Sequence, residues 1–134
     1  VLGGDAGKRW HHIIMRIFLL TKTPQSERTR LCLRFLARLI GSGDSAGSAD
    51  VVVYLAGDGV YNLINQGMQD CTSQAGIRLG KTLPALLPGN RIMACREDLL
   101  ARGISAHGNA TVPANFYELL VIDMMKEGSR IYTF

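Results

Sequence analysis

Short apolar runs alternate along this chain with segments of helical periodicity. Residues 15–20, 49–56 and 91–95 are rich in apolar and β-branched side chains, which is typical of buried parallel strands. Residues 24–40 instead place apolar side chains three and four positions apart, which indicates an amphipathic helix. Strands separated by helices predict a largely parallel sheet with right-handed crossovers and helices on both faces.

The first helix has a predicted beginning, end and buried side. Thr23 can cap it with Pro24 in the first position, and Gly41 is expected to end it. Its predicted inner stripe consists of Cys32, Phe35, Leu36 and Leu39.

The remaining elements complete an α/β fold with a sheet of about five strands. We expect helices to begin at residue 60 and to cover 81–87 and 113–126, a short strand at 104–106 and a final strand at 130–134. The last helix is expected to turn Phe116, Leu119, Leu120 and Met124 inward. Within the strands, the predicted buried residues include Phe18, Val52 and Ile92.

The carboxyl ends of the strands are the predicted location of function. In a parallel sheet these ends share one rim, so Lys22, Asp58 and Cys95 are expected to converge there. If the strand order reverses beside the first strand, a crevice is expected between Lys22 and Cys95.

Cys95 is the strongest candidate for chemistry. A thiol between a strand and a helix meets the amides of the first helical turn, which lowers its pKa and exposes the sulfur. Arg96 favours the thiolate, whereas Glu97 and Asp98 oppose it. The alternative is a small buried residue that ends a strand.

Composition narrows the class of protein. The 134 residues are 47% hydrophobic and 19% charged, which fits a globular domain and leaves no apolar run long enough to span a bilayer. The net charge of +4 is spread out, so direct binding of nucleic acid is not expected. Three cysteines without paired spacing argue against a disulfide framework and a metal site, and favour a reducing, cytoplasmic setting. We interpret residues 1–14 as an N-terminal extension or expression remnant, and 15–134 as a single domain.

Several short motifs follow one another along the chain. They are Lys22-Thr23-Pro24, Cys32-Leu33-Arg34-Phe35, Asp58-Gly59-Val60-Tyr61, Glu97-Asp98-Leu99 and Ala101-Arg102-Gly103. In these motifs and in their order, the chain resembles the DsrE/DsrF/DsrH-like sulfur-relay proteins, and most closely the DsrH/TusB type.

The resemblance implies a three-layer α/β/α fold, flavodoxin-like in outline, and a role in sulfur relay. Such proteins carry sulfane sulfur as a cysteine persulfide between donor and acceptor proteins, and they assemble as trimers or hexamers, often with related subunits. The motifs are DsrH-like, but a cysteine at position 95 is a DsrE-like feature. The region 66–89 is longer than in a typical DsrH chain.

These expectations assign the site residues. Cys95 is the predicted persulfide carrier, and the family match adds Cys32, although its place in the apolar stripe equally fits the core. Lys22 would stabilise an anionic sulfur group or be solvated, and Asp58 would orient a ligand or only form a turn. His107 in its loop is more often inert than a base toward Cys95.

Other function classes remain open at this point. Cys71 has no motif around it and is interpreted as structural or incidental. Thiolate chemistry needs no metal or organic cofactor. One alternative is a non-catalytic subunit of a DsrEFH/TusBCD-like assembly. A flavin- or nucleotide-binding module is weaker, because Pro24 and the lack of glycine hinder close approach of a phosphate to the loop at 21–26.

Overall fold

The computed structural model describes residues 15–41, 50–64, 82–106 and 108–134. In these residues the chain forms an α/β fold around a parallel sheet of four strands in the order β3-β2-β1-β4. The parallel α/β architecture was therefore predicted correctly. The strands are β1 (Arg16–Leu20), β2 (Val51–Leu55), β3 (Ile92–Ala94) and β4 (Arg130–Thr133).

The expected fifth strand at 104–106 does not form. Beside β3, the neighbouring position is taken by Thr111, which makes an isolated parallel bridge to Met93. The Thr111 amide donates to the carbonyl of Ile92, and its own carbonyl accepts from the Ala94 amide, at 2.8 and 2.9 Å. One bridging residue therefore covers this edge of the sheet, and the count of about five strands was too high for the described chain.

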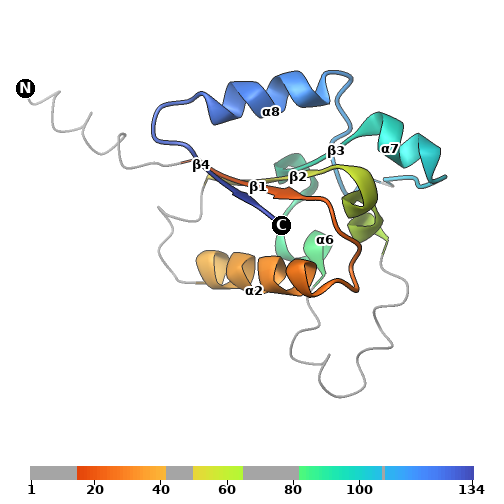
Figure 1. The fold of residues 1–134 in the computed structure, drawn as a ribbon, viewed down its shortest axis with the longest axis horizontal. Coiled ribbons are helices and arrows are strands. Elements are labelled where there is room, and N and C mark those ends of the chain that lie inside the picture. Colours follow the sequence, from red (N-terminus) through yellow and green to blue (C-terminus); the bar gives the residue numbers. More distant parts are fainter. Residues whose placement is uncertain (1–14, 42–49, 65–81, 107) are drawn as a thin grey trace, which may run out of the picture.

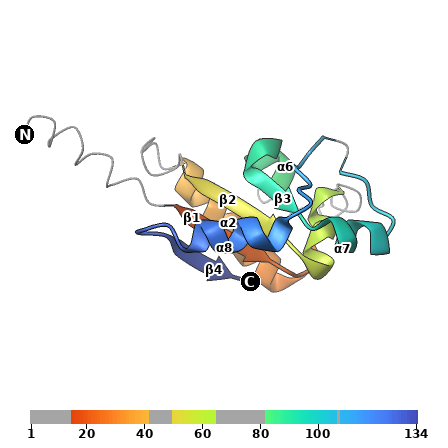
Figure 2. The same ribbon diagram turned by 90° about the horizontal axis from the view of Figure 1, so that it is seen from above.

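Helices lie against both faces of the sheet. In Figure 1, α2 and α6 lie on one face and α8 on the other, and Figure 2 shows α7 beyond one end of the strands. In the part of the chain that the structure describes, two 3-10 turns connect these elements. The helical elements are α2 (Glu27–Gly41), η1 (Gly57–Leu63), α6 (Leu83–Leu86), η3 (Gly89–Arg91), α7 (Arg96–Ala101) and α8 (Phe116–Met124).

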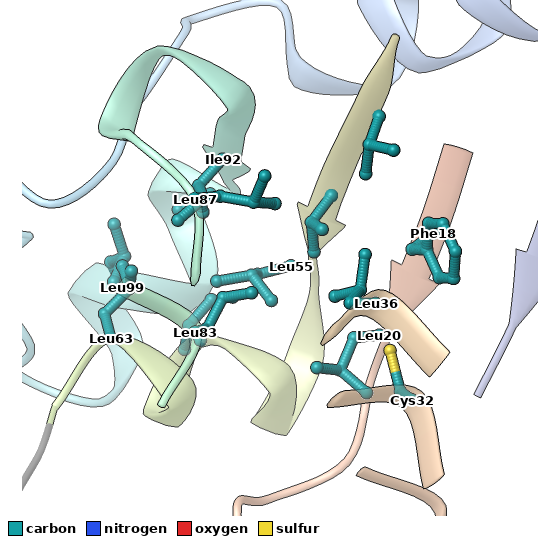
Figure 3. Packing of buried hydrophobic residues seen from close by; sticks show 14 residues of the cluster. Phe18, Leu20, Cys32, Leu36, Leu55, Leu63, Leu83, Leu87, Ile92 and Leu99 are labelled. Carbon is teal, nitrogen blue, oxygen red and sulfur yellow. The ribbon is translucent and has the colours of Figure 1, made fainter. Parts of the chain in front are cut away.

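The core on the α2 side contains the predicted stripe. Cys32 and Leu36 are fully buried, and Phe35 and Leu39 pack beside them. Figure 3 shows Cys32 and Leu36 facing the side chains of β1 and β2. Helix α2 ends at Gly41 as expected. It begins later than predicted, because Ser26 rather than Thr23 accepts a capping hydrogen bond from the Arg28 amide at 3.1 Å.

The core on the α8 side is smaller and includes a polar contact. Phe116 and Leu120 pack over the alternate residues of the strands, Val52 among them. The Tyr54 hydroxyl, which is buried under α8, donates to Asp123 at 2.5 Å. Burial and this carboxylate both raise the pKa of Tyr54. The buried positions expected in the strands, Phe18, Val52 and Ile92, are confirmed.

The later helices differ from their predicted limits. Helix α8 begins at Phe116 rather than at residue 113, and its Met124 is exposed rather than inward. Asp123 takes the inner position instead, because Tyr54 provides it with a donor. The helix expected from residue 60 is the 3-10 turn η1, and α6 is a single turn with Pro84 near its start.

Two glycines allow β2 to turn sharply into η1. Gly57 has a φ of 57°, in the left-handed region that favours glycine. A Cβ on Gly59 would collide with the carbonyl oxygen of Leu20. The turn after β2 therefore lies close against the end of β1. In the described parts of the chain, no helix is both long and apolar enough to cross a bilayer.

Candidate functional site

The candidate site lies at the carboxyl ends of β2 and β3, which are neighbours in the sheet. The Cys95 amide continues the sheet by donating to the carbonyl of Leu55 at 3.0 Å, and the Cys95 carbonyl accepts from the Leu99 amide in the first turn of α7. Cys95 is thus the residue between strand and helix that the sequence predicted. Its side chain points to the α8 face and is enclosed, with 2% of the residue exposed.

Acidic and phenolic groups surround the Cys95 sulfur. The thiol donates to Glu97 Oε1 at 3.6 Å, and Asp98 and Tyr117 also interact with it. Burial raises the pKa of Cys95 above its ordinary value of 9.0, and the carboxylates of Asp98 and Glu97 raise it further. The Asp98 amide acts in the opposite direction. The expectation of a lowered pKa and an exposed sulfur was therefore wrong, because burial and the carboxylates outweigh that amide.

Asp98 is held firmly in place as a carboxylate. Its Oδ2 accepts from the Gly57 amide at 2.7 Å, and Arg102 lies 3.5 Å from its Oδ1. The bond from Gly57 is the main cause that lowers the pKa of Asp98, and the Cys95 thiol and Arg102 add to it. Asp98 is therefore ionised at neutral pH and is a poor base toward the Cys95 thiol.

Arg102 joins α7 to the turn after β2. Its Nε and one terminal nitrogen both lie 3.1 Å from Asp58 Oδ1, and its other terminal nitrogen donates to the Asp98 carbonyl. The guanidinium also lies 6.0 Å from the centre of the Tyr61 ring. In this structure Asp58 is thus an ion-pair partner, and its predicted role toward a ligand stays a prediction.

Lys22 and Cys95 do not face one another across a crevice. The strand order does reverse beside β1, but the strand on the far side of the reversal is β4, not β3. Strand β2 separates the two residues, which places their backbones about 10 Å apart at the usual strand spacing. Lys22 is exposed, and its carbonyl accepts from the side chains of Thr29 and Asn62.

Cys32 is in the dry interior. It is fully buried, and burial alone raises its pKa to about 12. The accessibility that a second sulfur site would need is absent from this structure. Cys71 and His107 lie outside the described residues. Among the residues that are described, no group of three His, Cys, Asp or Glu side chains is arranged to hold a metal ion.

Sequence reasoning missed two residues of the site. Arg102 follows Asp98 by four positions in a helix, a spacing that brings opposite charges together and was available as a signal. Tyr117 has no such signal, because only the passage of α8 over the sheet brings it to Cys95. Comparison with protein-family models gave no match for this chain, and comparison with curated proteins gave none either.

Proposed function

We propose that this chain is a sulfur-relay protein of the DsrE/DsrH type, in which Cys95 carries sulfane sulfur as a persulfide between proteins. The observation that supports this is the gathering of Glu97, Asp98 and Tyr117 around a thiol at the end of a parallel strand. A thiol with a purely structural role needs only apolar neighbours, and Cys32 has such neighbours.

The proposal extends to the three-layer α/β/α fold and a cytoplasmic setting. The positions of α2 and α8 on opposite faces of the sheet support the layers (Figure 1). Free thiols at Cys32 and Cys95 agree with a reducing compartment.

The proposed reaction is thiol exchange at a sulfane sulfur. The Cys95 thiolate attacks the outer sulfur of a partner persulfide, R–S–SH, and the partner's S–S bond breaks as the new one forms. The products are the Cys95 persulfide and R–SH, which takes up the proton that Cys95 lost. Because the resting thiol is enclosed and its pKa is raised, sulfur exchange requires a local opening of the site, which a docked partner protein would stabilise. Donor and acceptor are therefore proposed to be proteins.

A second candidate is a non-catalytic subunit of a DsrEFH/TusBCD-like complex, as a homotrimer, a hexamer or a hetero-oligomer with related chains. The outer side of α8 favours it, because five large side chains there are exposed to solvent. They are Tyr117, Val121, Ile122, Met124 and Met125. In this alternative Cys95 never exchanges sulfur.

Mass spectrometry after incubation with a cysteine desulfurase and cysteine separates the candidates. We expect the wild-type protein to gain one sulfur, and the gain to disappear in Cys95→Ser while it persists in Cys32→Ser and Cys71→Ser. If none of the proteins gains sulfur, the carrier function is wrong and the assembly role is preferred. Light scattering and a flavin and nucleotide binding assay then follow.

A further inference from the structure

The charges nearest to the Cys95 sulfur are negative. Resting on the proposed function, we propose that Glu97 and Asp98 make Cys95 selective for partners that present Lys or Arg beside their reacting sulfur. Small anionic sulfur compounds are then poor donors and acceptors. The two carboxylates act as specificity-determining groups for the sulfur exchange.

The geometry keeps both carboxylates at the sulfur. Glu97 Oε1 lies 3.6 Å from Cys95 Sγ. Asp98 cannot swing away without losing its 2.7 Å bond from the Gly57 amide. A reacting sulfur that reaches Cys95 therefore passes these two negative groups at short range.

The neighbouring cations do not cancel this charge. The guanidinium of Arg102 is shared between Asp58 and Asp98. With Glu97, three carboxylates therefore share one positive charge, and the net charge of this group is negative. Arg96 is exposed at the first position of α7, and Lys22 is exposed beyond the intervening strand β2. Neither Arg96 nor Lys22 is among the groups that shift the pKa of the Cys95 thiol, whereas Asp98 and Glu97 are.

Electrostatics of this kind changes rates measurably. A site lined by one sign of charge raises the encounter rate of counter-charged reactants by about 10- to 1,000-fold, and salt removes the effect. A partner's ammonium or guanidinium group placed beside Glu97 would also offset the negative charge of Glu97, which raises the pKa of the Cys95 thiol. One cationic side chain would thus speed both the approach and the deprotonation of Cys95.

The test uses three small disulfides that differ in charge: cystamine (cationic), bis(2-hydroxyethyl) disulfide (neutral) and 3,3′-dithiodipropionate (anionic). The protein is the full chain with Cys32→Ser and Cys71→Ser, so that Cys95 is the single thiol. Each reaction joins one half of the disulfide to Cys95 and releases the other half as a thiol. Rates at low salt are divided by those of a neutral free thiol with the same reagent.

We expect the normalised rate for cystamine to exceed that for the anionic reagent by about 10-fold or more. Glu97→Gln and Asp98→Asn should each reduce this ratio, and 1 M salt should bring it close to one. Glu127→Gln, which removes a carboxylate beyond the far end of α8, should leave it unchanged. A ratio near one at low salt, a ratio that favours the anion, a ratio unmoved by Glu97→Gln and Asp98→Asn, or no reaction with any reagent would overturn the proposal.

The result of this test can be distinguished from the result of the persulfide test of the proposed function. If cystamine is preferred but Cys95 never gains a persulfide sulfur, the selectivity stands and the carrier function fails. If Cys95 gains sulfur but prefers the anionic disulfide, the carrier function stands and the selectivity fails.

Discussion

Cys32 and Cys95 are both buried thiols with raised pKa values, yet they lie in opposite cores of the sheet and have different neighbours. Around Cys32 burial is the whole cause of the raised pKa. Around Cys95 two carboxylates and one backbone amide contribute as well. Burial therefore does not distinguish a core cysteine from a candidate carrier in this protein. The two are distinguished by the polar groups that lie within reach of the sulfur.

The largest expected difference is in alkylation of the native protein. In a Cys71→Ser background with iodoacetamide at mildly alkaline pH, Cys95 should react about 100-fold faster than Cys32, or more. Cys95 needs only a local opening near α7 and Tyr117, whereas Cys32 needs the core to open. Quantitative mass spectrometry of the two peptides measures this, with the denatured protein as the control. Equal native rates would mean that the two thiols share one opening and that the comparison fails.

Serine substitution should separate the two positions in stability. Cys32→Ser buries a hydroxyl in an apolar core and should lower the free energy of unfolding by about 1–3 kcal/mol. Cys95→Ser should cost less than about 1 kcal/mol, because serine is favoured at the position before a helix and can accept from the Asp98 amide. Urea unfolding measures both, and Cys32→Ala is the control for lost volume alone. A larger loss for Cys95→Ser than for Cys32→Ser would contradict the assignment.

Lowering the pH should reveal how much the ionised Asp98 contributes to the free energy of unfolding. Its pKa in the folded protein is lowered below its ordinary value of 3.8, so its stabilisation is present above pH 3.8 and is lost as the pH falls through the folded value. We expect Asp98→Asn to be less stable than the wild type by about 1 kcal/mol at pH 7, and the gap to narrow in strong acid. Urea unfolding across this pH range is the measurement. A gap that does not change with pH would show that the charge of Asp98 is irrelevant.

The smallest expected effect concerns Glu97. Burial above all, and Asp98 and Glu97 after it, raise the pKa of Cys95 above 9.0, so the wild-type alkylation rate should keep rising as the pH passes that value. Glu97→Gln should lower this pKa slightly and increase the rate at pH 7.5 by about two- to threefold. Glu127→Gln is the matched control and should behave as the wild type. A slower reaction in Glu97→Gln would indicate that Glu97 acts as a base rather than as a repelling charge.

Local patterns in the sequence predicted the elements, and long-range pairing decided the rest. The stripe that includes Cys32 and Leu36 is a property of one helix, so its spacing was enough to predict it. The order of the strands depends on which backbones pair, and pairing of β1 with β4 prevents Lys22 and Cys95 from facing each other. No pattern within a single element contains that information.

The site was half predictable for the same reason. Cys95 at the junction of strand and helix follows from the sequence next to it, whereas Tyr117 reaches the sulfur only through the crossing of α8 over the sheet. In α8 the sequence predicted that Met124 points inward, but in the structure its neighbour Asp123 does. The buried hydroxyl of Tyr54 on β2 donates a hydrogen bond to this carboxylate. The periodicity of a helix contains no information about such a partner on another element.

The pairing of β1 with β4 also constrains how the chain folds as it is synthesised. Thr21 donates through both its amide and its hydroxyl to the carbonyl of Phe134, 113 positions further along the chain, and the Phe134 ring stacks on Phe18. A nascent chain emerging from the ribosome therefore exposes one edge of β1 and the Phe18 ring until β4 has been made. Such non-local contacts slow folding and leave the incomplete sheet open to aggregation. We expect the nascent chain to depend on chaperones until translation reaches β4.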